Sequence, residues 1–357
     1  MLCAQQRART NKYLNNATPT TTTTRPNVLL TLTLLSELKN AKSAFKEYLA
    51  VLPATFSTPL HYSIPELELL KGSPALDLVL ALYKNILKQY IYLHKMLKNP
   101  EASKAVGISS SNFAFDDYKW AVSAVMTRQN RVPVVADGKP EFALALIPLW
   151  DMLNHADGEI ITTMHDTGSE TTEYTAMTSF NAGDQATMFY GKRTNSDFLL
   201  NSGFVPITNA DDYLLIKLGV GKADSLFGLK NQLLTGLGIA TSGDFVVEST
   251  GEPDAQLNAF IRINAMTEAE LKACLADPGS CATLGTPDGA INTDNETKAC
   301  LFLEGRFKLL LLMYGKGGGA AAAGFHATCA NLLVGAEKEI LAKAMVVIAE
   351  RGLEEEL

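Results

Sequence analysis

The sequence predicts an α+β fold in which helical segments flank a compact, β-rich block. Three observations support this prediction. Apolar residues recur at helical spacing between residues 28 and 125, strand-like patterns dominate residues 142 to 190, and helical spacing returns after Lys222. Because helices and strands occupy separate stretches of the chain, the pattern is that of an α+β protein.

The first helical part contains one strong start signal, Ser73-Pro74, in which a capping serine precedes a proline in the first turn. The helix that begins there is expected to run to about Lys98, and another spans roughly Asp117 to Met126. The apolar side of the first helix is expected to carry Leu76, Leu80, Leu87 and Ile91.

The central block is expected to contain a buried strand at Phe142–Leu149 and then a hairpin. In the hairpin, apolar and polar residues alternate along two strands, Tyr174–Phe180 and Ala186–Tyr190. The turn-forming sequence Asn181–Asp184 lies between them. The block therefore has the short strands of a small sheet.

Beyond this block, Ser196–Ser202 fits a short helix closed by Gly203, and Leu214–Val220 fits a strand. Thr267–Glu270 is a capping box and predicts a helix start. Two long apolar helices and the Gly/Ala-rich linker between them are expected at residues 296–314, 336–349 and 315–324.

Length and composition limit the kind of protein. The chain has 357 residues, which is long for one core and suggests two domains. The net charge of −7 argues against nucleic acid as a partner, because phosphate binding requires a basic surface. No apolar run approaches the ~18 residues that span a bilayer. We therefore expect a globular protein with neither nucleic acid nor membrane as its partner.

The cysteines and the N-terminus carry little functional signal. The chain has an odd number of cysteines, and no two of them have the spacing of metal ligands, so reduced thiols are expected. They are Cys3, Cys274, Cys281, Cys300 and Cys329. The basic, acid-free N-terminus faintly resembles a transit peptide. Its threonine run has no amphipathic face, which favours a disordered tail over residues 1–27.

Three ordered motifs carry a family resemblance. They are the segment LIPLWDMLNH at Leu146–His155, MFYG at Met188–Gly191, and WAVSAVMTRQN at Trp120–Asn130. Together they resemble the SET-domain protein methyltransferases, in the branch that holds the Rubisco large-subunit and actin-histidine enzymes. The similarity covers roughly residues 28 to 350.

The resemblance implies a domain organisation. Residues 28–205 would form the remainder of a SET domain, with a helical insert at 28–125 and the C-terminal SET half at 126–205. Residues 206–357 would form a helical substrate-binding domain of the Rubisco-methyltransferase type. Small curved sheets with a knot-like crossing are typical of this family.

The resemblance also implies an activity, which is transfer of a methyl group from S-adenosylmethionine to a histidine of actin. Such a transfer is an in-line displacement that depends on positioning and exclusion of water, and it needs no metal. A cytoplasmic protein, also present in the nucleus, is expected. Two alternatives stay open: lysine methylation, and a truncated chain that binds actin without catalysis.

The family's cofactor wall corresponds to nine residues of this chain. Arg128 would meet the cofactor carboxylate, which suits the fork of a guanidinium group. Alone, Asn154-His155 would read as an ordinary turn with a solvated histidine, but the neighbouring motifs favour a site. The residues implied to bind the cofactor are Arg128, Asp151, Met152, Leu153, Asn154, His155, Ser202, Gly203 and Phe204.

Tyr190 matches the family's catalytic tyrosine. An ordinary phenol titrates near pH ~10, so this hydroxyl would be neutral and could orient the methyl group. A core aromatic is the alternative for an isolated Phe-Tyr pair. Gly191 directly after it favours the functional interpretation, because glycine allows backbone to approach a ligand.

Asn130 bears on the choice of substrate. Neutral imidazole already has a lone pair near pH 7, so a histidine enzyme must fix the tautomer, and an amide oxygen can accept the ring N–H. In the actin-histidine enzymes an Asn in an Arg-Gln-Asn sequence has this role, which matches Arg128–Asn130. Trp150 would form a flat wall beside the ring, and Arg193 would contact the substrate peptide. A loop amide, a core aromatic and a solvated charge are the respective alternatives.

One family feature is expected to be missing. Complete SET domains begin with a half-sheet whose glycine-containing loop wraps the methionine end of the cofactor, whereas the first glycine here is Gly72. The chain is therefore expected to be N-terminally truncated. It would be a shortened form of an active enzyme, a non-catalytic binding protein, or one part of a complex that supplies the missing half.

Overall fold

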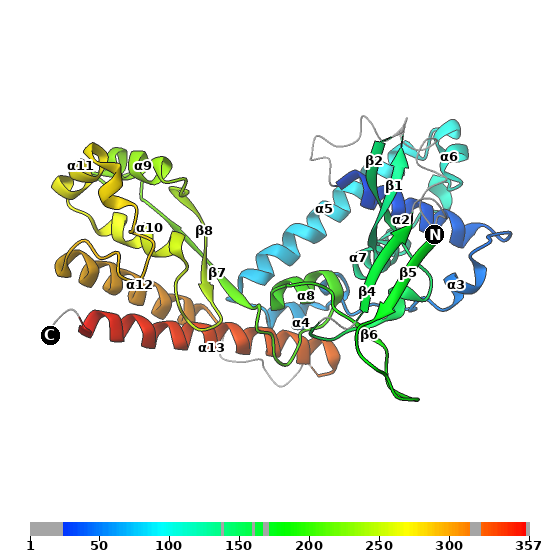
Figure 1. The fold of residues 1–357 in the computed structure, drawn as a ribbon. Coiled ribbons are helices and arrows are strands. Elements are labelled where there is room, and N and C mark those ends of the chain that lie inside the picture. The colour runs from blue at the N-terminus through cyan, green and yellow to red at the C-terminus, as the bar shows by residue number, and fades with distance from the viewer. Residues whose placement is uncertain (1–23, 137–138, 159–160, 167–170, 315–322, 355–357) are drawn as a thin grey trace. The chain divides into compact units, whose positions relative to one another are not determined.

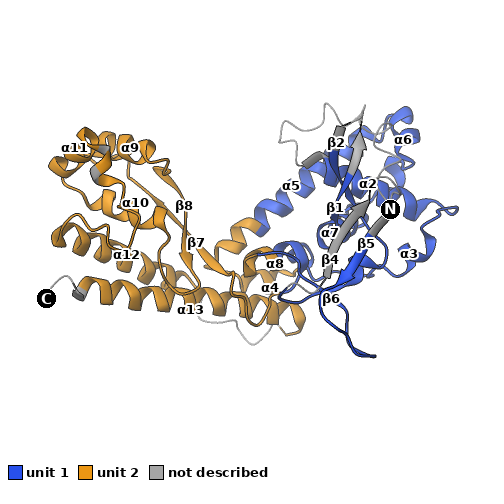
Figure 2. Cartoon of the chain, in the orientation of Figure 1, with its two compact units in different colours: residues 1–61, 79–192, 200–204 blue, residues 62–78, 193–199, 205–357 orange. Residues whose placement is uncertain are grey.

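The computed structural model describes residues 24–136, 139–158, 161–166, 171–314 and 323–354 (Figure 1). The chain divides into two compact units (Figure 2). The first comprises the described residues of 1–61, 79–192 and 200–204, and the second those of 62–78, 193–199 and 205–357. Both units combine segments that are distant in sequence. The predicted domain boundaries stay a prediction.

The first unit has a helical core. Helix α2 packs against α7, and buried side chains such as Leu34, Leu93 and Tyr118 fill the space between the helices. Helix α5 begins in the second unit and continues into the first. The helices of this unit are α2 (Thr24–Lys39), α3 (Lys46–Ala50), α5 (Pro74–Met96), α6 (Pro100–Val106) and α7 (Phe115–Arg128).

Helix α5 confirms the predicted start, because the Ser73 hydroxyl accepts a hydrogen bond from the backbone N–H of Ala75 at 3.0 Å. The predicted buried face is wrong. Leu80, Leu87 and Ile91 are 52%, 39% and 46% exposed, whereas a second stripe, Val79, Ile86 and Leu93, is buried. The helix carries two apolar stripes with the same periodicity, and only tertiary packing selects between them.

The strands of the first unit pair two by two. The predicted strand at 142–149 is confirmed as far as Ala145, and its partner begins at Asn130. Its predicted burial is wrong at Phe142, which is 60% exposed, whereas Ala143 and Ala145 are buried. The pairs are β1 (Asn130–Ala136) with β2 (Lys139–Ala145), β4 (Ile161–Asp166) with β5 (Thr171–Ala176), both antiparallel, and β3 (Asn154–His155) with β6 (Thr187–Met188), parallel.

The predicted hairpin between residues 174 and 190 is wrong. A turn does form at Asn181–Asp184, where the Asn181 carbonyl accepts the N–H of Asp184 at 3.1 Å. However, β5 pairs with β4, and β6 pairs with β3. Alternating side chains identify a strand but not its partner. The observed pairing joins the motif at 146–155 to the motif at 188–191, because it sets His155 opposite Met188.

The second unit is mostly helical around one antiparallel strand pair, whose strand at 213–219 confirms the prediction. Its helix start at Thr267 is the predicted capping box, with the Thr267 N–H donating to Glu270 Oε2 at 2.7 Å. Helix α8 (Asn195–Ser202) begins in this unit and ends in the first, which contains Leu200–Phe204. The other elements are α4 (Ile64–Glu68), β7 (Tyr213–Gly219), α9 (Phe227–Gly236), β8 (Ser242–Glu248), α10 (Ala255–Ala265), α11 (Glu268–Ala276), α12 (Thr293–Met313) and α13 (Phe325–Glu354).

The cysteines depart from the expectation of reduced thiols. Cys274 and Cys281 form a disulfide, because α11 ends between them and brings their Cα atoms to 5.8 Å. Cys300 and Cys329 are buried. Within the described ranges no group of three or more His, Cys, Asp and Glu side chains could hold a metal ion.

Two sequence features fall largely outside the described residues, namely the tail up to residue 23 and the linker at 315–322. Helix α2 begins at Thr24, so the expectation of a disordered tail up to residue 27 is wrong for residues 24–27. None of the helices in the described part of the chain is long and apolar enough to cross a membrane.

Candidate functional site

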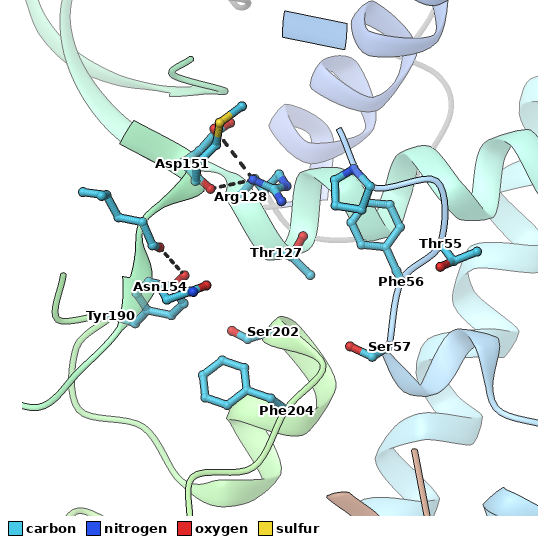
Figure 3. Close-up of a pocket in the computed structure, with 13 residues that line it drawn as sticks. Thr55, Phe56, Ser57, Thr127, Arg128, Asp151, Asn154, Tyr190, Ser202 and Phe204 are labelled. Atoms are coloured by element: carbon cyan, nitrogen blue, oxygen red, sulfur yellow. Dashed lines mark hydrogen bonds and ion pairs between the residues drawn. The ribbon is translucent and has the colours of Figure 1, made fainter. Parts of the chain in front are cut away.

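A cavity of about 210 Å³ lies in the first unit (Figure 3). Its walls come from the segment before α4, the end of α7, the turn before β3, and the residues after β6 and α8. The lining residues are Pro53, Thr55, Phe56, Ser57, Thr127, Arg128, Asp151, Met152, Leu153, Asn154, Tyr190, Ser202 and Phe204.

The turn before β3 has an unusual backbone. Leu149 has φ +71°, in the left-handed region that side chains other than glycine rarely adopt, and its side chain is 79% exposed. The short 3₁₀ helix Trp150–Met152 follows directly, with Trp150 and Asp151 buried. The sharp turn at Leu149 therefore sends the next two side chains inward. Such strain is typical of functional sites.

Arg128 and Asp151 form the charged part of the cavity wall (Figure 3). Arg128 ends α7, and its Nη1 donates to the main-chain oxygen of Asp151 at 2.7 Å and lies 3.8 Å from Oδ1. Its Nε is buried without a hydrogen-bond partner among the described residues. Burial raises the pKa of the Asp151 carboxyl, although the hydrogen bond from Tyr48 and the charge of Arg128 lower it.

Tyr190 follows β6 and lines the cavity beside Asn154 (Figure 3). Its hydroxyl donates to the Leu153 carbonyl at 2.7 Å, and its backbone N–H donates to His155 Nδ1 at 3.3 Å. The His155 and Tyr190 rings lie 5.3 Å apart. His155 is not a lining residue and instead supports the backbone and ring of Tyr190 from behind. Gly191, which directly follows Tyr190, has φ +93°.

Asn130 and Trp150 contact each other at the base of β1. The Trp150 indole N–H donates to Asn130 Oδ1 at 3.2 Å, and Asn130 Nδ2 donates to the Arg128 carbonyl at 3.0 Å. These two bonds fix which end of the amide is oxygen. Tyr174 stacks on Trp150, with ring centroids 3.8 Å apart.

The end of α8 confirms the predicted helix and its closing glycine. Gly203 has φ +80°, and a Cβ there would lie 2.8 Å from both Ser57 Oγ and the backbone nitrogen of Thr58. This close approach brings Ser202 and Phe204 to the cavity opposite Ser57 (Figure 3). Gly203 is therefore required both by its backbone conformation and by its neighbour.

The structure gathers most of the predicted site residues. Four of the predicted residues lie beside the cavity wall and do not line the cavity themselves: Asn130, Trp150, His155 and Gly203. Arg193 belongs to the second unit, where its carbonyl accepts a hydrogen bond from Asn209 at 2.8 Å. Those predicted residues that line the cavity are Arg128, Asp151, Met152, Leu153, Asn154, Tyr190, Ser202 and Phe204.

Sequence reasoning missed the wall formed by residues 53–57. This segment has no motif, and it is held by tertiary contacts, since the Trp120 indole donates to the Pro53 carbonyl at 2.9 Å. Phe56 packs against Trp120 at 5.8 Å. Tyr48 and Tyr174, behind the cavity, were also missed. Thr127 alone had a signal, because it precedes Arg128 at the end of α7.

Comparisons with known proteins find relatives in both sequence and fold. Residues 221–317 match the family described as Rubisco LSMT substrate-binding. The chain is 41% identical over 332 residues to the actin-histidine N-methyltransferase of Gallus gallus, which covers 89% of this chain and 55% of that protein. It is 41% identical over 293 residues to the Homo sapiens protein of the same name, covering 81% of this chain and 48% of that protein.

Solved structures share the fold. A crystal structure of the SET domain of LSMT bound to lysine and AdoHcy superposes with a TM-score of 0.76 at 18% identity, covering 99% of this chain and 80% of that chain. Rubisco LSMT bound to AdoMet gives a TM-score of 0.75 at 18% identity, with the same coverage of both chains.

The chain spans about half the length of the curated relatives that it matches. Its 41% identity extends over most of its own residues, and its SET fold is shared with LSMT. The chain is therefore similar over most of its own length to the actin-histidine N-methyltransferases, shares the fold of the SET domain of LSMT, and matches the Rubisco LSMT substrate-binding family over residues 221–317.

Proposed function

We propose that this chain forms the catalytic part of a protein methyltransferase that uses S-adenosylmethionine to methylate a histidine of actin. The observation that carries the proposal is the Asn130–Trp150 hydrogen bond beside a cavity lined by Arg128, Asn154 and Tyr190. The names of the curated relatives support the choice of reaction and substrate.

The cavity residues fit the chemistry of this cofactor. Arg128 Nε is buried without a hydrogen-bond partner among the described residues, so it is available to a carboxylate. The Asn154 amide can bond to a purine or ribose, and the rings of Tyr190 and Phe204 can enclose apolar parts. The bound cofactor would supply an electrophilic methyl group on a sulfonium.

The protein side of the reaction is positioning of imidazole. Asn130 Oδ1 accepts one hydrogen bond from Trp150, and a carbonyl oxygen has a second lone pair. That lone pair can accept one ring N–H of a substrate histidine, which leaves the other ring nitrogen unprotonated as the nucleophile. Tyr190, whose hydroxyl is tied to the Leu153 carbonyl, would form part of the wall around the reacting atoms and exclude water.

The substrate and its location follow from the same proposal. The match of residues 221–317 to a substrate-binding family supports a role for the second unit in holding the protein substrate. Arg193 is proposed to contact that substrate. We propose the cytoplasm, and also the nucleus, as the site of action, because actin occurs in both.

Two measurements test the proposal. Calorimetry should detect S-adenosylhomocysteine binding to the full chain, and Asn154→Ala should weaken it about five-fold, because a charge-free amide contact is worth roughly a kilocalorie per mole. Methyl transfer is then followed on actin peptides with His, Ala or Lys at the target position. Transfer to the Ala peptide, or to Lys in preference to His, would refute the histidine assignment.

A further inference from the structure

Tyr48 lies behind the cavity and has no role in the proposed chemistry so far. It belongs to α3, is only 7% exposed, and does not line the cavity. Its hydroxyl donates a hydrogen bond to Oδ2 of Asp151, a residue 103 positions later in the chain. Loss of this hydrogen bond would leave a buried carboxylate oxygen without its donor, which costs free energy. The contact therefore ties α3 to the turn that contains Asp151.

Asp151 is shared between Tyr48 and Arg128. Its carboxylate is fully buried, with Oδ2 bound by Tyr48 and Oδ1 at 3.8 Å from Arg128 Nη1. Oδ1 makes no hydrogen bond to the described residues. The same guanidinium donates from Nη1 to the Asp151 carbonyl, and its Nε stays without a partner. Among the residues that the structure describes, Arg128 thus has hydrogen bonds at one nitrogen only.

The third neighbour of the carboxylate is Tyr174, whose hydroxyl is buried and has no hydrogen-bond partner in the described part of the chain. Burial, followed by the negative charge of Asp151, raises the pKa of Tyr174. Tyr48 is therefore the one tyrosine of the two that donates to Asp151, although both are close enough to be affected by its charge.

We propose that Tyr48 is a positioning residue: by occupying one carboxylate oxygen of Asp151, it keeps Arg128 oriented toward the carboxylate of the bound cofactor. This inference rests on the proposed function. Guanidinium and carboxylate groups favour a two-pronged pair. Without the Tyr48 hydroxyl, the buried Asp151 carboxylate would need new donors, and Arg128 is the nearest cation. The guanidinium would turn to Asp151 and leave the cavity.

The experiment compares two probes on the full chain. S-adenosylhomocysteine has the amino-acid carboxylate, whereas 5′-methylthioadenosine has the same nucleoside and sulfur without it. Calorimetry on Tyr48→Phe should show about ten-fold weaker binding of S-adenosylhomocysteine, which corresponds to one lost hydrogen bond to a charged group. Binding of 5′-methylthioadenosine should change by less than about two-fold.

The matched control is Tyr118→Phe. Tyr118 is a buried tyrosine of the same unit, and its hydroxyl donates to Gln89 Oε1 at 3.0 Å away from the cavity. This variant should bind both probes as the parent does. Combining Tyr48→Phe with Asp151→Asn removes the carboxylate that would draw Arg128 away, so this double variant should bind S-adenosylhomocysteine more tightly than Tyr48→Phe. If Tyr48→Phe alone fails to fold, the double variant should still bind S-adenosylhomocysteine more tightly than Arg128→Ala, and equally weak binding would overturn the proposal.

Each outcome decides between the proposals. A parent chain that binds neither probe overturns the proposed function, and with it the role of Tyr48. A parent chain that binds S-adenosylhomocysteine, with Tyr48→Phe unchanged, overturns the role of Tyr48 alone. Equal weakening of both probes in Tyr48→Phe also overturns it, because general support of the cavity would not depend on the ligand's carboxylate.

Discussion

Asn130 has both ends of its amide engaged, by the Trp150 indole and by the Arg128 carbonyl. Asn130→Leu leaves a substrate imidazole without its acceptor, and an unsatisfied buried donor costs about 1–3 kcal/mol. We expect at least a ten-fold loss of histidine methylation, measured as kcat/KM on an actin peptide. Trp150→Phe, which keeps an aromatic ring but loses the indole N–H, should have a smaller effect. An unchanged rate in Asn130→Leu would contradict the assigned role.

Glu337 is a buried acid away from the cavity. Burial raises the pKa of its carboxyl to about 7, although hydrogen bonds from Ser73 and Tyr314 oppose the shift and the charge of Asp212 adds to it. Those hydrogen bonds measure 2.9 Å and 3.0 Å. An unfolded glutamate titrates near 4.5. The folded state therefore binds more protons between these two values.

The sign of the resulting pH dependence follows from linkage. The contribution of Glu337 to the free energy of unfolding is complete below pH ~4.5 and is lost as the pH rises to about 7, a change on the order of 3 kcal/mol. Glu337→Gln should remove this decline in urea denaturation at pH 5 and pH 7.5. Glu252→Gln, at an exposed position, should keep it. Equal pH dependence in parent and Glu337→Gln would disprove the prediction.

Among the elements, α8 is the one whose end shapes the cavity. Gly203→Ala combines a left-handed backbone, which costs roughly 1–2 kcal/mol for a residue with a Cβ, with a clash at 2.8 Å from Ser57. We expect thermal unfolding to show destabilisation and calorimetry to show weaker S-adenosylhomocysteine binding. Gly183→Ala is the control, because Gly183 has φ +94° with no atom within 4 Å. It should lose some stability and keep its affinity; equal loss of affinity in both variants would exclude the clash as the cause.

At the scale of the whole molecule, each unit has its own hydrophobic core. Both tryptophans of the chain, Trp120 and Trp150, are in the first unit, which also contains the cavity. Tryptophan fluorescence therefore reports on the cavity-bearing unit, whereas circular dichroism reports on helices of both units.

This separation gives a test of ligand binding. S-adenosylhomocysteine at 100 times its Kd should stabilise the cavity-bearing unit by about 2.7 kcal/mol, because it binds only the folded state. Fluorescence-detected thermal unfolding should shift to higher temperature, and Asn154→Ala should shift less at the same ligand concentration. A shift of the same size in Asn154→Ala would place the ligand outside the cavity.

The sequence by itself determined the features that depend on local chemistry. Ser73-Pro74 predicted the start of α5, the Thr267–Glu270 capping box predicted α11, and Gly203 predicted the end of α8. Caps and positive φ angles involve neighbouring residues only, so their signals are written in a few consecutive letters. The ordered motifs likewise contain six of the predicted residues that line the cavity, namely Arg128, Asp151, Met152, Leu153, Asn154 and Tyr190.

Tertiary structure alone decided which surfaces and strands meet. It selected the buried stripe of α5, paired β6 with β3 in place of a hairpin, and joined Cys274 to Cys281. It also brought the motif-free segment 53–57 to the cavity and set Tyr48 against Asp151. These contacts link residues far apart in the chain or depend on how a helix turns. Hydrophobic periodicity and secondary-structure propensity are properties of one segment at a time. They therefore do not predict which segment another segment will pack against or pair with.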